Sequence, residues 1–198
     1  MRRSIWQNVK RQLGGAKNKW RRTYVTMTTP AEVKAANELK KQLPTSYASY
    51  FYMASQSSNS DAVTLAGYLV LTANLPASQS VLLQNDLTST ADAELAATVE
   101  ALESVPHMKR QSGAFVIVTG QLQLVKEYND FSLFEHYGPN SKQNDDAGRL
   151  MQKIAELVLT YRNLRIVSYE ETDNRKAQFL QNKLMRIITA YVDAKRSK

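Results

Sequence analysis

The sequence contains no cysteine, which excludes disulfide bonds, thiolate metal sites and a cysteine nucleophile. It has only two histidines, His107 and His136, and neither has a partner at the spacing of a metal site. Seven dispersed glycines form none of the motifs that cradle phosphates or present a catalytic serine. No run approaches about 18 consecutive apolar residues, so we expect no membrane-spanning segment. We therefore expect no cofactor and no metal, and predict that the chain is not an enzyme.

Acidic residues are absent from the first 22 positions, and the first carboxylate is Glu32. These positions, the basic segment, hold eight of the 26 Lys and Arg, which leaves 18 basic and 18 acidic residues in 23–198. The whole net charge of +8 therefore resides on the basic segment, an arrangement typical of polyanion binding. The residues that we predict to contact nucleic acid are Arg2, Arg3, Lys10, Arg11, Lys17, Lys19, Arg21 and Arg22.

The apolar residues of the basic segment are regularly spaced. Trp6, Leu13 and Trp20 recur at intervals of seven, so a helix would gather them on one side, and we predict that they form a subunit interface. Ser4 suits a helix N-cap, and Gly14-Gly15 suits a break. We therefore predict a helix-turn-helix arm.

Three functions are compatible with such a segment. It can be a nucleic-acid-binding arm, an amphipathic helix lying on an acidic membrane, or a disordered basic tail. The regular apolar spacing argues against the tail, and we favour the nucleic-acid arm. A cleavable targeting peptide is not expected, because no apolar core follows the charges.

The remainder of the chain is predicted to be all-α, with a helical-bundle body over residues 29–198 and the arm over 1–28. Ser89 and Asp145-Asp146 are suitable helix starts. The last two predicted helices would form an antiparallel hairpin. Residues 113–128 fit either a strand with a small β-hairpin near 115–125 or a buried helix, and we lean towards the helix. The predicted helices cover residues 29–43, 61–74, 77–87, 89–105, 145–168 and 172–194.

Two further clusters have competing interpretations. The aromatic residues of 45–58 can stack on bases, but we favour core or subunit interface, because no basic residue lies between Lys41 and Lys109. The acidic residues of helix 89–105 are interpreted as a solvated helix face that includes Asp92, Glu94, Glu100 and Glu103.

A basic arm with a central break, followed by a neutral, cysteine-free and mostly helical body, resembles the major coat proteins of filamentous dsDNA archaeal viruses, of the lipothrixvirus and rudivirus type. The resemblance covers overall organisation, without a diagnostic motif. It implies an arm that wraps dsDNA in A-form and a four-helix-bundle body packed in a helical shell. It also implies a homodimer or a heterodimer with a related coat protein, an enveloping lipid membrane in some members, and location in the virion.

The function predicted from these features is structural packaging of nucleic acid by a viral coat protein. The arm supplies charge without an evident base reader, as expected of a protein that tracks the phosphate backbone. Two alternatives remain: a cellular, non-enzymatic nucleic-acid-binding protein associated with chromatin or ribosomes, and a peripheral membrane protein.

Overall fold

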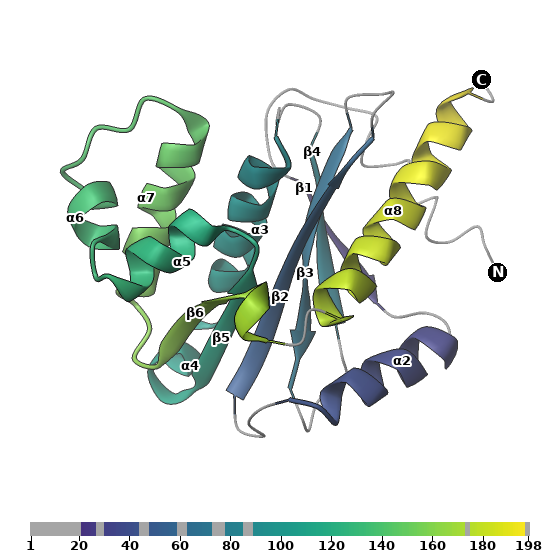
Figure 1. The fold of residues 1–198 in the computed structure, drawn as a ribbon, viewed down its shortest axis with the longest axis horizontal. Coiled ribbons are helices and arrows are strands. Elements are labelled where there is room, and N and C mark those ends of the chain that lie inside the picture. Colours follow the sequence, from purple (N-terminus) through teal and green to yellow (C-terminus); the bar gives the residue numbers. More distant parts are fainter. Residues whose placement is uncertain are drawn as a thin grey trace.

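The chain folds around a six-stranded sheet (Figure 1). The computed structural model describes residues 21–26, 30–43, 48–58, 63–72, 78–84, 89–172 and 175–196. The strands are β1 (Arg21–Thr26), β2 (Ala48–Ser57), β3 (Thr64–Leu71), β4 (Ser78–Gln84), β5 (Ala114–Thr119) and β6 (Leu164–Ser168).

The sheet is mixed, with the spatial order β1-β4-β3-β2-β5-β6. The first four strands in this order are joined by antiparallel ladders, whereas β2, β5 and β6 run parallel. Parallel neighbours need long crossover connections, and helices supply most of them. The carboxyl ends of β2, β5 and β6 therefore meet at one edge of the sheet, which we call the carboxyl edge.

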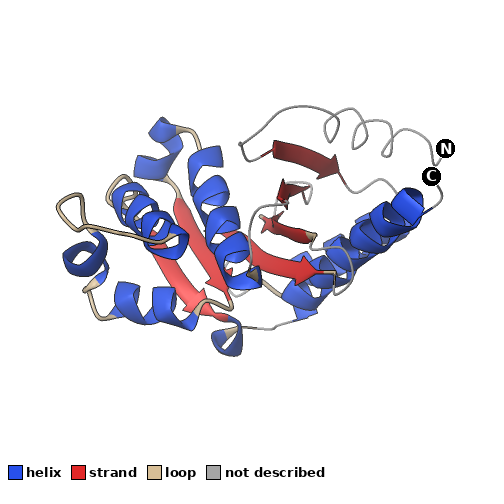
Figure 2. Cartoon of the chain, turned by 90° about the horizontal axis from the view of Figure 1, so that it is seen from above, coloured by secondary structure: helices blue, strands red, loops and turns tan. Residues whose placement is uncertain are grey.

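Helices cover both faces of the sheet, as Figures 1 and 2 show. On one face lie α3 (Thr90–Ser104), α5 (Leu122–Asn129), α6 (Leu133–Tyr137) and α7 (Asp146–Val158). On the other face lie α2 (Pro30–Lys40) and α8 (Arg175–Arg196). A short helix, α4 (His107–Ser112), precedes β5, and a 3-10 turn, η1 (Tyr169–Glu171), follows β6.

The two buried layers follow from strand alternation. In β2, Phe51 and Met53 point into the core beneath α3, while Tyr50 and Tyr52 point into the core beneath α8. The strand is apolar on both sides because both sides are covered, as is usual for strands between two helical layers. The interpretation of these aromatic residues as core is confirmed.

The predicted all-α body is wrong. The predicted helices 61–74 and 77–87 are the strands β3 and β4, and 113–128 contains strand β5 followed by helix α5. Residues Thr64 to Leu69 of β3 are all buried, so an apolar run without alternation mimicked a buried helix. Periodicity alone does not distinguish these two structures.

The predicted helical hairpin at the end of the chain is also wrong. Helix α7 ends at Val158, and β6 enters the sheet beside β5 before α8 begins. Helices α2, α3 and α8 are confirmed near their predicted bounds. Ser89 caps α3 as predicted, with its hydroxyl oxygen accepting from the Asp92 amide at 3.0 Å. In the described ranges, no helix is long and apolar enough to cross a membrane.

Candidate functional site at the carboxyl edge

A buried carboxylate, that of Glu94, lies at the carboxyl edge. Ligands of α/β proteins bind outside the carboxyl ends of parallel strands, so polar groups there are candidates for function. Glu94 belongs to α3 and is only 6% exposed. Alanines of the same helix, including Ala93 and Ala97, are buried against the sheet and let α3 approach it closely.

Three strands contribute polar groups around this carboxylate. Thr119, at the end of β5, donates its hydroxyl proton to Glu94 Oε1 at 2.6 Å. The Gly120 amide donates to the same oxygen at 2.7 Å, and the Tyr169 hydroxyl, just after β6, lies 3.1 Å from it. Ser55 of β2 lies 3.5 Å from the other oxygen, Oε2. We call these five residues the Glu94 cluster.

The two oxygens of Glu94 have different surroundings. Oε1 is held by close donors, whereas Oε2, within the described part of the chain, has only the long contact with the Ser55 hydroxyl. Buried carboxylates need such donors to offset the cost of leaving water. The donors on Oε1 fix the orientation of the group, and Oε2 keeps acceptor capacity for a further partner.

Tyr169 connects the cluster to β2. Its hydroxyl donates to the backbone carbonyl of Met53 and also lies beside Glu94. Burial raises the pKa of Tyr169 well above its usual value, and the adjacent Glu94 charge raises it further. The phenol therefore stays protonated and acts as a hydrogen-bond donor rather than an acid.

Gly120 leaves no room for a side chain. A Cβ atom at this position would lie 2.9 Å from Cε2 of Tyr169 and 3.6 Å from Glu94 Oε1. The absent side chain thus lets the tyrosine ring approach the strand end while the amide still binds Glu94.

The strand register aligns the basic segment with the carboxyl edge. Arg21 of β1 pairs with Leu83 of β4, Leu83 with Leu65 of β3, and Leu65 with Gln56 of β2. Gln56 directly follows Ser55 of the Glu94 cluster. Three strand spacings of about 4.8 Å separate Arg21 from Gln56, or about 14 Å. The basic segment therefore joins the sheet at the same edge as Glu94.

Most of the predicted site residues lie outside the described part of the chain. This holds for the arm residues Arg2, Arg3, Lys10, Arg11, Lys17 and Lys19, and for the predicted interface residues Trp6, Leu13 and Trp20. Arg21 and Arg22 are the first residues of β1 and pair with Leu83 and Leu82.

The sequence interpretation missed the Glu94 cluster. Glu94 was predicted on a solvated face, and this is wrong, because its side chain is buried. Glu94, Thr98 and Ala101 recur at helical spacing and are all buried. The small residues on the same side of the helix as Glu94 were the signal in the sequence that this side is buried. The partners Thr119 and Tyr169 come from distant segments and carry no local signal. Among the described residues, no group of three or more His, Cys, Asp or Glu could hold a metal ion.

Comparisons with known proteins identify no family for this chain. No family model and no curated protein matches it. Among solved structures, the crystal structure of RNase H1 from the halophilic archaeon Halobacterium salinarum NRC-1 is similar, with 14% identity and a TM-score of 0.44. The match covers 66% of this chain and 92% of that one.

The coat-protein resemblance is wrong, because it required a helical-bundle body and the body is built on a sheet. The viral coat function and its coat-protein partners are wrong with it. The alternatives of a non-enzymatic nucleic-acid-binding protein and a peripheral membrane protein are not supported either, and nucleic acid itself remains a proposed partner. The prediction that the chain is not an enzyme is withdrawn as well. It rested on the absence of local motifs, and the Glu94 cluster is a polar site assembled from distant segments without such a motif.

Proposed function

We propose that this chain binds nucleic acid, with the basic segment on the phosphates and the carboxyl edge facing the bound strand. The register that places Arg21 in line with Gln56 carries this proposal, because it puts the last two cations of the basic segment, Arg21 and Arg22, at the edge that holds Glu94. A segment with eight cationic and no anionic side chains attracts a polyanion over a range set by the Debye length.

Phosphate contacts predict binding that tolerates sequence and depends strongly on salt. Each neutralised phosphate contributes a slope of about −0.9 for duplex, or about −0.7 for single strands, to a plot of log K against log salt. The test compares the native full-length chain with a variant in which the six basic residues of positions 1–20 are replaced by Gln. The slope is measured with the nucleic acid that the native chain binds more tightly. The slope of the variant should be smaller in magnitude than that of the native chain by about 4 to 5.

A second variant controls for net charge. It replaces six exposed cations of the body by Gln, which are Lys34, Lys41, Lys126, Lys142, Arg149 and Arg186. The proposal requires this variant to keep most of the native affinity for DNA and RNA. Equal losses in the two variants would mean that total charge, and not the basic segment, governs binding. Absence of binding by the native chain would reject the proposal.

A second candidate function, cleavage of the bound strand, is favoured by the geometry of Glu94. Its Oε1 is fixed by donors, and its Oε2 is the acceptor that remains at the carboxyl edge. A carboxylate so oriented can accept a proton from a water that attacks a phosphodiester. The bond from phosphorus to the leaving sugar oxygen then breaks, and that oxygen takes up a proton from solvent. If the native chain cleaves DNA or RNA, Glu94→Gln should lower the rate about a hundredfold or more while binding is kept. If the native chain cleaves neither, this candidate is rejected and the binding proposal is unaffected.

A further inference from the structure

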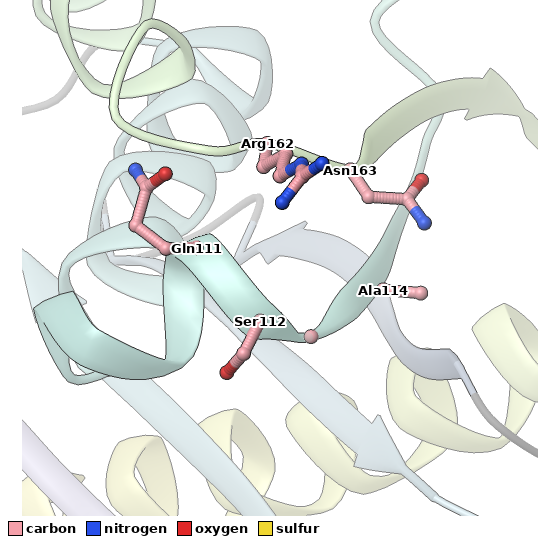
Figure 3. A pocket seen from close by; sticks show the side chains of 6 residues that line it. Gln111, Ser112, Ala114, Arg162 and Asn163 are labelled. Carbon is pink, nitrogen blue, oxygen red and sulfur yellow. The ribbon is translucent and has the colours of Figure 1, made fainter.

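A second polar feature lies at the opposite edge of the sheet, where β5 and β6 begin. It is an open pocket of about 590 Å³ between the end of α4 and the turn that precedes β6. Figure 3 shows Arg162 between Gln111 and Asn163. The pocket is lined by Gln111, Ser112, Gly113, Ala114, Arg162 and Asn163.

The two walls of this pocket are tied to each other. The Arg162 amide donates to the Arg110 carbonyl at 3.2 Å, and Gln111 Nε2 donates to the Thr160 carbonyl at 2.7 Å. Arg110 also donates through Nη1 to the Thr160 hydroxyl at 3.1 Å. A pocket held in this way does not have to be assembled when a ligand binds, which lowers the cost of binding.

Arg162, which lines the pocket, and the neighbouring Arg110, which does not, have different roles. The guanidinium of Arg110 is occupied, because it also donates to the carbonyls of Val105 and Glu103 and lies over the Tyr161 ring. The guanidinium of Arg162 is exposed and forms no hydrogen bond or ion pair with the described residues. Arg162 is therefore free to bind a ligand.

The surroundings of Arg162 favour an anion. Lys109 and Arg165 are exposed cations two positions from the lining residues Gln111 and Asn163 in the chain. The nearby carboxylate of Glu103 is paired with Lys153 at 3.7 Å. A planar guanidinium with five donors is well suited to bind a phosphate oxygen pair.

We propose that this pocket holds one nucleotide unit, with Arg162 on the phosphate and the amide of Asn163 on the edge of the base. Its volume lies in the range of pockets for small organic ligands and is larger than a phosphate needs. The side-chain amide of Asn163 offers a donor and an acceptor to a base, whereas the amide of Gln111 is bonded to the Thr160 carbonyl. The choice of a nucleotide rests on the proposed nucleic-acid function; the choice of a phosphate-bearing group rests on Arg162.

The nucleotide can be a free molecule or one unit of a bound strand, and binding measurements separate these sources. Full-length protein is titrated with adenosine monophosphate, with a short single-stranded oligothymidylate and with inorganic phosphate. Arg162→Ala should weaken binding of adenosine monophosphate about tenfold, the loss expected for one charge-assisted contact. Arg186→Ala is the matched control. Arg186 is also an exposed arginine, but it belongs to α8, a helix that does not line the pocket.

Competition between the probes identifies the source. Displacement of adenosine monophosphate by oligothymidylate assigns the pocket to a bound strand, and lack of displacement assigns it to a free nucleotide. Equal binding of adenosine monophosphate by native and Arg162→Ala protein overturns the inference, as does equal affinity for inorganic phosphate and the nucleotide. If Arg162→Ala loses binding of adenosine monophosphate but keeps strand binding, the proposal that the basic segment binds nucleic acid is unaffected. Loss of strand binding on neutralising positions 1–20, with nucleotide binding unchanged, shows that the two sites act separately.

Discussion

Tyr169 donates its hydroxyl proton to the backbone carbonyl of Met53, a residue 116 positions earlier in the chain. The bond joins the segment after β6 to β2 and passes across the end of β5, which lies between them. The same hydroxyl lies 3.1 Å from Glu94 Oε1. One side chain therefore connects β2, the segment after β6 and the buried carboxylate.

Replacement of this tyrosine by phenylalanine tests that connection. Tyr169→Phe removes the hydrogen bond to Met53 and the contact with Glu94 while keeping the ring. We expect the free energy of unfolding to fall by about 1–2 kcal/mol, since a partly buried carbonyl loses its donor. Urea denaturation measures this value. Tyr137→Phe is the control, because the Tyr137 hydroxyl accepts only from the exposed Gln123 amide. Equal effects of the two substitutions would argue against a stabilising role for the Tyr169 hydroxyl.

The stability of the α5–α6 region should depend on pH through Glu127. The hydrogen bond from Ser132, followed by the contact with His136, holds the pKa of Glu127 below its usual value, while burial opposes them. A carboxyl whose pKa is lower in the folded state adds stability above its unfolded pKa, about 4.5 here. That contribution is lost as the pH falls through the folded pKa.

Ser132→Ala removes the largest cause of this shift. The difference in unfolding free energy between native and Ser132→Ala protein should be greatest above about pH 4.5 and should shrink as the pH is lowered further. Ser141→Ala is the control, since the Ser141 hydroxyl donates to the Gly138 carbonyl, which does not titrate. A pH-independent difference for Ser132→Ala would contradict the assignment.

Arg162, which lines the pocket at the amino ends of β5 and β6, and the neighbouring Arg110 should differ in their contribution to stability. Arg110→Ala removes contacts to Val105, Thr160 and Glu103, and we expect a loss of about 2 kcal/mol in unfolding free energy. Arg162→Ala removes an exposed side chain and should stay within about 0.5 kcal/mol of the native value. Thermal or chemical denaturation of both variants gives the comparison. A large loss for Arg162→Ala would indicate a structural role instead.

Local signals in the sequence were sufficient to locate helices α2 and α3. Ser89 identified the start of α3, and an apolar stripe ending near Pro44 identified α2. Strands between two helical layers gave no such signal, because residues such as Leu65 and Ala66 of β3 are buried on opposite faces. Apolar residues then occur at consecutive positions of the strand, and the alternation of apolar and polar residues that distinguishes a strand from a helix disappears.

The candidate site was less predictable than the fold, because its residues meet only through the sheet. Glu94, Thr119 and Tyr169 are separated by at least 25 positions, and no spacing rule relates them. The charge of the basic segment was visible at once, but the position of its last residues, Arg21 and Arg22, at the edge of the sheet that holds Glu94 follows from the pairing of β1 with β4. Long-range strand pairing is the kind of information that a single sequence does not display.

Phe131 occupies a backbone conformation that favours glycine, and it gives the last prediction. Its φ is 59°, and its side chain is 92% exposed. The Ser132 amide donates to the Glu127 carbonyl, and the Phe131 amide to the Tyr128 carbonyl, which is the pattern of a helix end with a left-handed residue after the cap.

Phe131→Gly relieves the strain and loses no packing, at the cost of more freedom in the unfolded chain. We expect a net gain of about 0.5–1 kcal/mol in unfolding free energy. Phe131→Ala keeps the strain, so it should change stability by less than about 0.5 kcal/mol. A loss of stability in the glycine variant would show that the exposed ring makes a stabilising contact, and the strain argument would then be wrong.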